Sequence, residues 1–237
     1  MRRLKDWVRV CLFRDAPLCA LHQKFRQYLQ LQKKNWPFMK YDVGYFYQGW
    51  ERLKISGIRR TEERFSQYEV EEILRELRKQ RAQIEVLDVG ANVGFFALNL
   101  APYVTHIDAV EVNPYLVKIG EEAARYLGIS NVKYHKTDFT QFHSDKQYDL
   151  IIALACYSTD DSKINIELRE YFERLYHLLK SGGVLLFESH NKDVNNPHFF
   201  QVIDSLNDLF IKRKEKFFKN SILRGGKRYF YVFEKKD

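Results

Sequence analysis

The sequence has few of the residues that staple small extracellular domains. Its three cysteines, Cys11, Cys19 and Cys156, are odd in number and lack C-x-x-C spacing. They indicate neither a disulfide framework nor a zinc site, so we expect reduced thiols and no metal. No apolar run approaches the roughly eighteen residues of a membrane span, and charged residues interrupt the N-terminus where a signal peptide would be apolar. These absences predict a cytoplasmic protein without a transmembrane segment.

Charge is unevenly distributed along the chain, whose formal net charge is +8. Residues 1–60 contain 14 Lys and Arg against 4 Asp and Glu, residues 61–210 contain 15 against 24, and residues 211–237 contain 10 against 3. Basic ends favour an anionic partner, such as phosphate, an acidic glycan, RNA or the inner membrane surface, which the N-terminus would touch peripherally. The alternative is a solvated surface whose charge serves solubility.

Residues 1–60 differ in composition from the rest and predict a basic helical and aromatic cap. An apolar stripe at helical spacing opens the chain, at Leu4, Trp7, Val8 and Cys11. Such a stripe packs on its own domain or lies on a membrane surface. Aromatic residues then crowd the segment 36–50 among one Pro and two Gly. This density favours a packed irregular layer over a regular element.

Strands and helices alternate over residues 61–237, which we expect to form the main domain. The predicted strands are 85–89, 106–112, 132–138, 148–155, 183–189, 210–218 and 228–234. The predicted helices are 61–81, 95–100, 114–127, 161–180 and 196–206. Repeated β-α units predict a Rossmann-like α/β fold, with a seven-stranded, mostly parallel sheet and helices on both faces. The short last link predicts an antiparallel hairpin at one edge.

The run VLDVGANVGFF, residues 86–96, is the most informative part of the sequence. It combines a short apolar strand, a Gly-rich turn and the start of a helix, and such a turn lets the backbone approach a bound nucleoside. Glu111 ends the next strand, where a carboxylate would meet ribose hydroxyls. A dinucleotide fold needs G-x-G-x-x-G, but Asn92 and Phe95 occupy its second and third glycine positions. The run therefore indicates a nucleoside cofactor without a pyrophosphate.

These residues resemble the class I S-adenosylmethionine-dependent methyltransferase family. The family's first motif, an acidic residue followed by G-x-G-x-G, is matched by Asp88, Gly90, Asn92 and Gly94. Asn is the non-glycine residue that best tolerates the left-handed backbone of the middle position. The segments YDLIIALA, residues 148–155, and LLKSGGVLLFESH, residues 178–190, resemble the family's fourth strand and fifth-strand motif.

The resemblance implies S-adenosylmethionine as cofactor and S-adenosylhomocysteine as product. In the TDF segment, Asp138 matches the residue that accepts from the adenine amino group, and Phe139 could flank the ring. Some members that methylate glycans hold the methionine carboxylate with an Arg, which Arg64 resembles, with Tyr47 as a second contact. A pairing of Arg64 with a Glu of its own helix is the alternative. The full implied cofactor set is Tyr47, Arg64, Asp88, Gly90, Asn92, Gly94, Phe95, Glu111, Val112, Asp138, Phe139 and Ala153.

Methyl transfer to a hydroxyl gains from a positioned base. His190, directly after the fifth-strand motif, is the predicted base, with a structural His as the alternative. Glu188 is predicted to orient His190 or touch the substrate, and Tyr157 to line the acceptor pocket or act in catalysis. Nothing near Cys156 marks it as the activated thiolate that pyrimidine C5 methylation would need. Asp160 and Asp161 are better explained as helix caps than as metal ligands.

The segments GIRRTEERF, GFF and FESHN resemble the methyltransferases of cell-surface glycan pathways. They predict O-methylation of a small-molecule or saccharide hydroxyl on a lipid-linked or anionic acceptor. The loop ALACYST has no proline, which disfavours methylation of exocyclic base amines. Two other hypotheses are an RNA methyltransferase, whose basic and aromatic N-terminal residues would hold the RNA, and a non-catalytic partner protein on the same fold.

Overall fold

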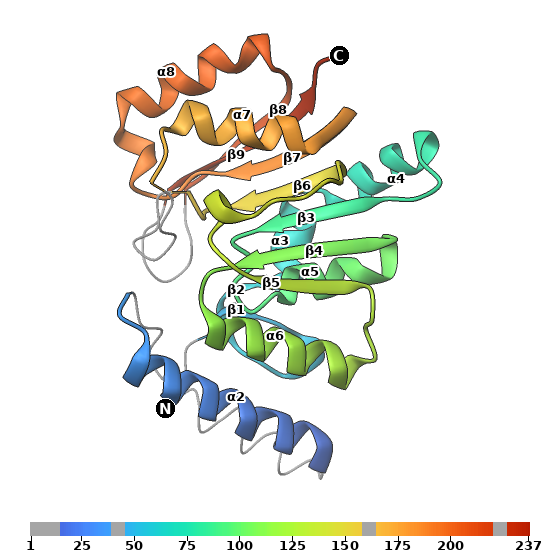
Figure 1. Cartoon of the computed structure of the whole chain (residues 1–237), viewed down its shortest axis with the longest axis vertical. Helices are drawn as coiled ribbons and strands as arrows, with labels where there is room; N and C mark the ends of the chain where they lie inside the picture. The colour runs from blue at the N-terminus through green and yellow to red at the C-terminus, as the bar shows by residue number, and fades with distance from the viewer. Residues whose placement is uncertain (1–14, 39–45, 158–164, 220–226) are drawn as a thin grey trace.

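The computed structural model describes residues 15–38, 46–157, 165–219 and 227–237. A seven-stranded sheet of order β5-β4-β3-β6-β7-β9-β8 forms its centre (Figure 1). Its strands are β3 (Glu85–Val89), β4 (His106–Glu111), β5 (Val132–Lys136), β6 (Tyr148–Leu154), β7 (Leu179–Glu188), β8 (Phe210–Phe218) and β9 (Arg228–Lys235). Strands β3 to β7 are parallel, and β9 is antiparallel to both of its neighbours. The predicted Rossmann-like sheet with its edge hairpin is confirmed.

Helices cover both faces of this sheet, and apolar side chains fill both interfaces. One face carries α3 (Thr61–Gln67), α4 (Val70–Gln80), α5 (Phe95–Leu100) and α6 (Pro114–Leu127), and the other α7 (Leu168–Leu178) and α8 (Pro197–Ser205). In Figure 1, α7 and α8 lie in front of the strands, and α3 and α5 lie behind them. Two buried layers on one sheet explain why the central strands are almost continuously apolar.

The helix predicted over residues 61–81 is in fact two helices. The break falls at Tyr68 and Glu69, and Glu69 has a left-handed backbone with φ of 54°. Side-chain contacts fix both residues, because Tyr68 is fully buried and donates its hydroxyl to Glu188 Oε1 at 2.7 Å. Glu69 pairs with Lys214 and Lys216 of β8. These partners lie more than a hundred residues away, so local periodicity could not predict the break.

Strand β7 begins four residues earlier than predicted, and α7 ends at Leu178 instead of residue 180. The chain passes from helix to strand without a loop, and Leu179 already pairs with Tyr148 of β6. Lys180 follows and bonds the buried Asp149 Oδ2 at 2.7 Å. The ion pair between Lys180 of β7 and Asp149 of β6 thus stabilises a part of β7 that precedes the apolar run in the sequence. The predicted caps Asp160 and Asp161 lie outside the described residues.

A long N-terminal helix, α2 (Ala16–Asn35), was missing from the predicted elements. Asp15 caps it by accepting the Leu18 N–H at 3.0 Å, and a Pro occupies its first turn. The side chains on its buried face are Leu18, Leu21, His22, Phe25, Leu29 and Gln32. A capping Asp before Pro, followed by this apolar spacing, is a readable signal for a helix start. The predicted stripe at residues 4–11 lies outside the described residues.

The aromatic segment contains regular structure, contrary to the predicted irregular layer. Strands β1 (Phe46–Gly49) and β2 (Gly57–Arg60) form a separate two-stranded parallel sheet. Gly49 and Gly57 pack back to back, since a Cβ on Gly57 would lie 2.0 Å from the Gly49 nitrogen. Of the aromatic residues of this segment, Phe46 and Trp50 pack against Phe95 of α5.

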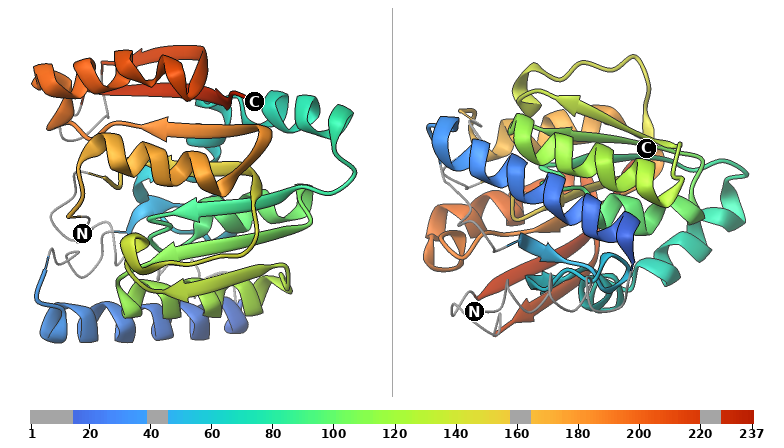
Figure 2. Two further views of the ribbon diagram at one scale, coloured as in Figure 1. Left: turned by 45° about the horizontal axis from the view of Figure 1, so that its top comes forward. Right: turned by 90° about the horizontal axis from the view of Figure 1, so that it is seen from below.

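The N-terminal layer shares a hydrophobic cluster with the main domain. Phe25 of α2 packs against Phe95 of α5, with 6.4 Å between ring centroids, and Trp50 lies 5.7 Å from the same ring. Figure 2 shows α2 alongside α6, at one edge of the sheet. We propose residue 60 as the boundary between this layer and the main domain.

The structure bears on two of the opening expectations, the state of the cysteines and the absence of a membrane span. Cys156 is free and buried, as expected for a reduced thiol, whereas Cys19 is disulfide-bonded, which the expectation missed. Among the described residues, no helix combines the length and the apolar character that a membrane span requires.

The basic residues of β8 have carboxylate partners within the domain. Arg213 binds Glu234 through two hydrogen bonds of 2.8 and 2.9 Å, and Lys212 binds Glu215 at 2.7 Å. Lys214 and Lys216 share Glu69, as described above. Because these cations already have carboxylate partners, the excess of charge over residues 211–237 does not itself indicate an anionic partner for β8.

Candidate functional site

The turn between β3 and α5 has the left-handed backbone that its sequence predicts. The φ angles of Gly90, Asn92 and Gly94 are 68°, 58° and 70°. The two glycines are also required by space. A Cβ on Gly90 would lie 2.4 Å from the Cys156 Cβ, and one on Gly94 would lie 2.2 Å from the Tyr134 hydroxyl. The side chains of Cys156 and Tyr134 therefore pack against the turn and leave no space for a side chain at either glycine.

Glu111 ties this turn to the end of β4. Its carboxylate accepts the Asn92 N–H and the Asn113 N–H, each at 2.8 Å, and the residue is 8% exposed. A carboxylate has about four lone-pair positions, so these two bonds leave acceptor capacity for a ligand. Glu111 thus lies beside the turn, as predicted, and also holds its shape. Val112 follows it, half-buried, at the start of the β4–α6 connection.

Gln48 of β1 holds the other side of the turn, a role that sequence reasoning missed. Its Oε1 accepts the Phe95 N–H at 3.0 Å and the Phe96 N–H at 3.4 Å, and its Nε2 donates to the Ala91 carbonyl at 3.1 Å. The first N–H groups of a helix need acceptors, and Gly94, at the N-cap of α5, has no side chain to offer. A glutamine more than forty residues upstream supplies that cap, so no local signal marks it.

Several predicted cofactor residues direct their side chains into the core. Phe139 is 3% exposed, and its ring packs edge-on against Tyr171 at 5.3 Å. Phe95 and Ala153 are completely buried. In this conformation their side chains are closed to a ligand, which counts against the Phe139 ring as a flank for adenine. Asp138 is half-buried, and its Oδ1 accepts the Thr140 N–H at 2.7 Å.

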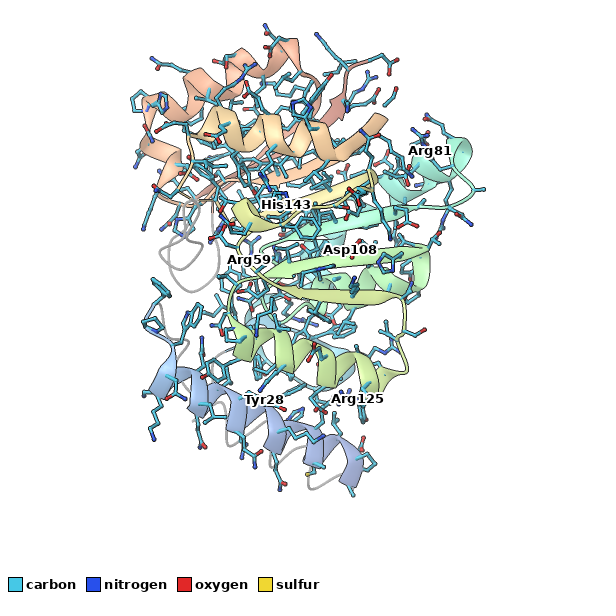
Figure 3. All side chains as sticks on the ribbon, in the orientation of Figure 1. Tyr28, Arg59, Arg81, Asp108, Arg125 and His143 are labelled. Atoms are coloured by element: carbon cyan, nitrogen blue, oxygen red, sulfur yellow. The ribbon has the colours of Figure 1, made fainter. Side chains whose placement is uncertain are left out.

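Glu188 does not have the role predicted for it. Its buried carboxylate binds Arg59 of β2 through two bonds of 3.1 and 2.9 Å and accepts the Tyr68 hydroxyl at 2.7 Å. No bond joins Glu188 to His190 among the described residues, and its side chain has no exposed surface. Glu188 is therefore a positioning residue that holds Arg59 at the edge where the parallel strands end (Figure 3).

Arginine charges stabilise this carboxylate. Burial alone would raise the pKa of Glu188, but Arg59, Arg64 and Arg228 outweigh burial and hold the pKa below its usual range. The carboxylate in turn outweighs the effect of burial on Arg59, whose pKa is raised. The end of β7 thus carries a permanently ionised cluster that is richer in cations than in anions.

Arg64 is the buried cation of this cluster that lacks a partner. It is 3% exposed, and its guanidinium lies 5.7 Å from the Tyr68 ring centroid and 5.4 Å from that of Phe96. Its Nε is enclosed without a hydrogen-bond partner, and within the described ranges no ion pair reaches it. The alternative pairing with a Glu of its own helix is therefore wrong. Tyr47, half-buried on β1, lies close enough to Arg64 to contribute to the raised pKa of its guanidinium.

Asp88 is a buried carboxyl near Arg64, and one of its oxygens also lacks a partner. It is 4% exposed, and its Oδ2 is enclosed without a hydrogen bond among the described residues. Burial raises the pKa of Asp88 to about 7; Arg64 opposes the shift and Glu111 adds to it. Burying an unsatisfied guanidinium and an unsatisfied carboxylate is costly. Such a cost is typical of a site that a ligand completes.

The residues predicted for the acceptor side lie after the ends of β6 and β7. His190 is half-buried; its backbone N–H donates to Asp193 Oδ2 at 2.7 Å, and its Nδ1 lies 3.4 Å from the Lys192 nitrogen. That second contact is long, and because a backbone N–H only donates, Nδ1 is the acceptor in it. Tyr157 donates its hydroxyl to the Ile166 carbonyl at 3.0 Å, which favours a pocket wall over a catalytic group.

Cys156 is unsuited to nucleophilic catalysis. Burial raises the pKa of its thiol to about 12, and the sulfur lies 3.4 Å from the Tyr171 hydroxyl. Because the thiolate is the nucleophile, a thiol in this environment stays unreactive near neutral pH. Its packing against Gly90 explains why a small side chain stands there. No group of three or more His, Cys, Asp or Glu is placed to hold a metal in the described part of the chain.

Comparison with known proteins gives a consistent family assignment. The family described as methyltransferase domain matches residues 60–220. A malonyl-[acyl-carrier protein] O-methyltransferase of Ilyobacter polytropus is 28% identical over 59% of this chain and 49% of its own length. A probable (S)-tetrahydroprotoberberine N-methyltransferase of Papaver bracteatum is 30% identical over 64% and 42%. The matched region thus spans about half the length of these curated relatives.

A solved structure matches more of the chain. The N-methyltransferase NodS of Bradyrhizobium japonicum, in complex with S-adenosylhomocysteine, has a TM-score of 0.59 and 20% identity over 90% of this chain and all of NodS. At this identity the likeness concerns the fold, which it supports over most of the chain.

Replacing Gln48 tests whether its side chain holds the turn. We expect Gln48→Met to lower the free energy of unfolding by about 1–3 kcal/mol, because the Phe95 and Phe96 N–H groups would be left buried without an acceptor. The measurement is urea denaturation followed by circular dichroism. Gln30→Met, on the exposed face of α2, is the matched control and should change stability by less than about 0.5 kcal/mol. Equal stability of the two variants would show that the Gln48 side chain does not hold the turn.

Proposed function

The chain belongs to the methyltransferase domain family; we propose that it is an S-adenosylmethionine-dependent methyltransferase that methylates a hydroxyl oxygen of a small-molecule or saccharide acceptor. The partnerless Arg64, buried beside Asp88, is the observation that carries the proposal for the cofactor site. The relatives include both O- and N-methyltransferases. The choice of oxygen rests on the half-buried His190 at the end of β7, because a hydroxyl gains more from a base than an amine does.

Arg64 and Asp88 fit the methionine end of the cofactor. A guanidinium binds a carboxylate with two parallel hydrogen bonds, and a carboxylate accepts from an ammonium group. The two side chains lie near each other with unsatisfied polar atoms, so an amino-acid zwitterion would satisfy both at once. Tyr47 borders Arg64 and is proposed as a further contact of the carboxylate.

The turn and the strand ends fit the nucleoside. Glu111 keeps acceptor capacity at the end of β4, where we assign it to the ribose hydroxyls. The main chain from Gly90 to Gly94 and the residues Val112 and Asp138 border the same edge of the sheet. When bound, the cofactor supplies a methyl group on a sulfonium, which is the electrophile of the transfer.

The chain's own contribution to chemistry lies on the acceptor side. We assign His190 to the removal of the hydroxyl proton, since imidazole titrates near neutral pH and Asp193 fixes the backbone that carries it. Tyr157 and the packed ends of β6 and β7 would border the acceptor and exclude water. The RNA hypothesis rests on basic and aromatic N-terminal residues, part of which lie outside the described residues; the basic residues of β8 are paired within the domain and add no support to it.

Removing the Arg64 charge tests the cofactor assignment. We expect Arg64→Gln to weaken S-adenosylhomocysteine binding by about 10- to 100-fold, the value of a hydrogen bond to a charged group. Stability should not fall, because the variant removes a buried cation without a partner. Isothermal titration calorimetry and thermal unfolding measure the two effects. Arg60→Gln, at the exposed neighbouring position, is the matched control. An unchanged affinity for Arg64→Gln would refute the assignment.

The raised pKa of Asp88 predicts a pH dependence of cofactor binding. A ligand ammonium needs the ionised carboxylate, so affinity for S-adenosylhomocysteine should rise by about 10-fold between pH 6 and 8 as Asp88 loses its proton near pH 7. For the folding stability of the ligand-free protein, the effect of rising pH through Asp88 has the opposite sign. The unfolded carboxyl ionises near its ordinary value while the folded one stays protonated, so this group's contribution to stability decreases as pH rises towards 7. Calorimetric titrations across this range measure the affinity.

Asp88→Asn is the control for this titration. It keeps the shape of the side chain without an ionisable carboxyl, so its affinity should be weak and nearly constant from pH 6 to 8. A variant that keeps the wild-type pH profile would assign the titration to another group.

His190→Ala tests the acceptor chemistry. Labelled S-adenosylmethionine is offered with a panel of sugars, sugar phosphates, phenols and amines, and the methylated product is identified. We expect transfer to oxygen, and a loss of about 10²–10⁴-fold in turnover for His190→Ala with cofactor affinity unchanged. His198→Ala, an exposed histidine of α8, is the control. Transfer to nitrogen alone, or unaffected turnover, would contradict the proposal.

A further inference from the structure

Arg228 is a second arginine of the cluster that lacks a sufficient partner. It is the first residue of β9 and lies beside the end of β7, where the Ser189 N–H donates to the Tyr229 carbonyl at 2.8 Å. His190 is the next residue along the chain. Because β9 is antiparallel to β7, Arg228 stands at the same edge of the sheet as the acceptor side.

The contacts of Arg228 within the described residues leave most of its hydrogen-bonding capacity unused. A guanidinium has five N–H donors, yet Arg228 makes one long bond, from Nη1 to the Ser189 carbonyl at 3.4 Å. Its Nε is enclosed without a partner, although the residue is 8% exposed. The nearest carboxylate oxygen, Glu188 Oε2, is 3.9 Å away, beyond hydrogen-bond distance.

Glu188 cannot supply the missing partner. Its two oxygens already accept both Arg59 bonds and the Tyr68 hydroxyl. No hydrogen bond or ion pair joins the second carboxylate of this region, Asp88, to Arg228 among the described residues. Three buried guanidinium groups therefore share one carboxylate that already accepts three hydrogen bonds from Arg59 and Tyr68 and one carboxyl that is only partly ionised near neutral pH.

Loading the cofactor does not remove this surplus of positive charge. S-adenosylmethionine carries one carboxylate, one ammonium and one sulfonium, so it adds a net positive charge to the site. The carboxylate would be taken by Arg64, under the proposed function. The surplus that then remains is concentrated at Arg228, whose Nε has no partner among the described residues and whose carboxylate neighbour is 3.9 Å away, and a buried cation so weakly compensated is unfavourable.

We propose that Arg228 binds an oxyanion, a carboxylate or a phosphate, carried by the methyl acceptor. This inference rests on the proposed function and specifies its acceptor as anionic. The fork of the guanidinium would hold the anion in a defined orientation beside Ser189, and the acceptor hydroxyl would then face the neighbouring His190. Arg228 thereby acts as a specificity-determining residue, and Glu188 keeps Arg59 from competing for the same anion.

The test uses the full chain saturated with S-adenosylhomocysteine. Sodium phosphate and sodium acetate are titrated separately by calorimetry at constant ionic strength, as probes for the two kinds of oxyanion. We expect saturable millimolar binding of at least one probe, and an affinity lower by about 10-fold or more in Arg228→Gln. Affinity for S-adenosylhomocysteine should stay within about two-fold of wild type in this variant. The probe that binds more tightly identifies the anion.

Two further variants keep the test decisive. Arg213→Gln, on the same hairpin but paired with Glu234, should leave anion binding unchanged. Arg228→Lys keeps the charge without the fork, and should bind the probe with intermediate affinity even if Arg228→Gln fails to fold. Absence of binding of both probes, or equal binding by wild type and the Arg228 variants, overturns this inference while S-adenosylhomocysteine still binds. Loss of S-adenosylhomocysteine binding in the wild type would instead overturn the proposed cofactor site.

Discussion

The buried pair of Arg59 and Glu188 is the interaction on which the site depends. It joins β2 of the N-terminal layer to the last residue of β7, and the Tyr68 hydroxyl completes it. A buried ion pair is stable only when its geometry satisfies both partners, so these bonds fix where β2, α3 and β7 meet. The break before α4, the place of Arg64 on α3 and the position of β1 all follow from this constraint. Through β1, the same constraint places Gln48 against the turn.

Two buried carboxylates on one face of the sheet have opposite electrostatic environments. Glu188 is surrounded by arginines and remains ionised, whereas Asp88 is dominated by burial and titrates near neutral pH. Environments that separate two pKa values in this way commonly separate two roles. Glu188 is structural and holds a cation, and Asp88 is available to a ligand. Since Glu188 binds Arg59, we propose that the remaining cations, Arg64 and Arg228, bind groups that come from outside the chain.

Local signals carried the prediction of the main domain and of the turn. The strands 85–89 and 210–218 and the helices 95–100 and 114–127 have the predicted bounds, because apolar spacing and caps such as Asn113 act within a few residues. Prediction failed where the local conformation depends on a partner that is far away in the sequence. Glu69 breaks a helix because β8 supplies its lysines, and Gln48 caps a helix that begins far along the chain. The helix α2 is different, since its cap and apolar spacing were readable from the sequence.

The sequence by itself determined the Rossmann-like sheet, the left-handed turn at Asn92 and the family to which the chain belongs, because each depends on residues close together in the chain. Only the tertiary structure decided which charged groups are paired. Glu188 and Arg64 are both charged residues near an expected site. The sequence does not show that the Glu188 carboxylate is bound within the domain, whereas the Arg64 guanidinium has an Nε without a partner among the described residues. That difference arises from desolvation and distance, which exist only once β2, α3, β7 and β9 have come together.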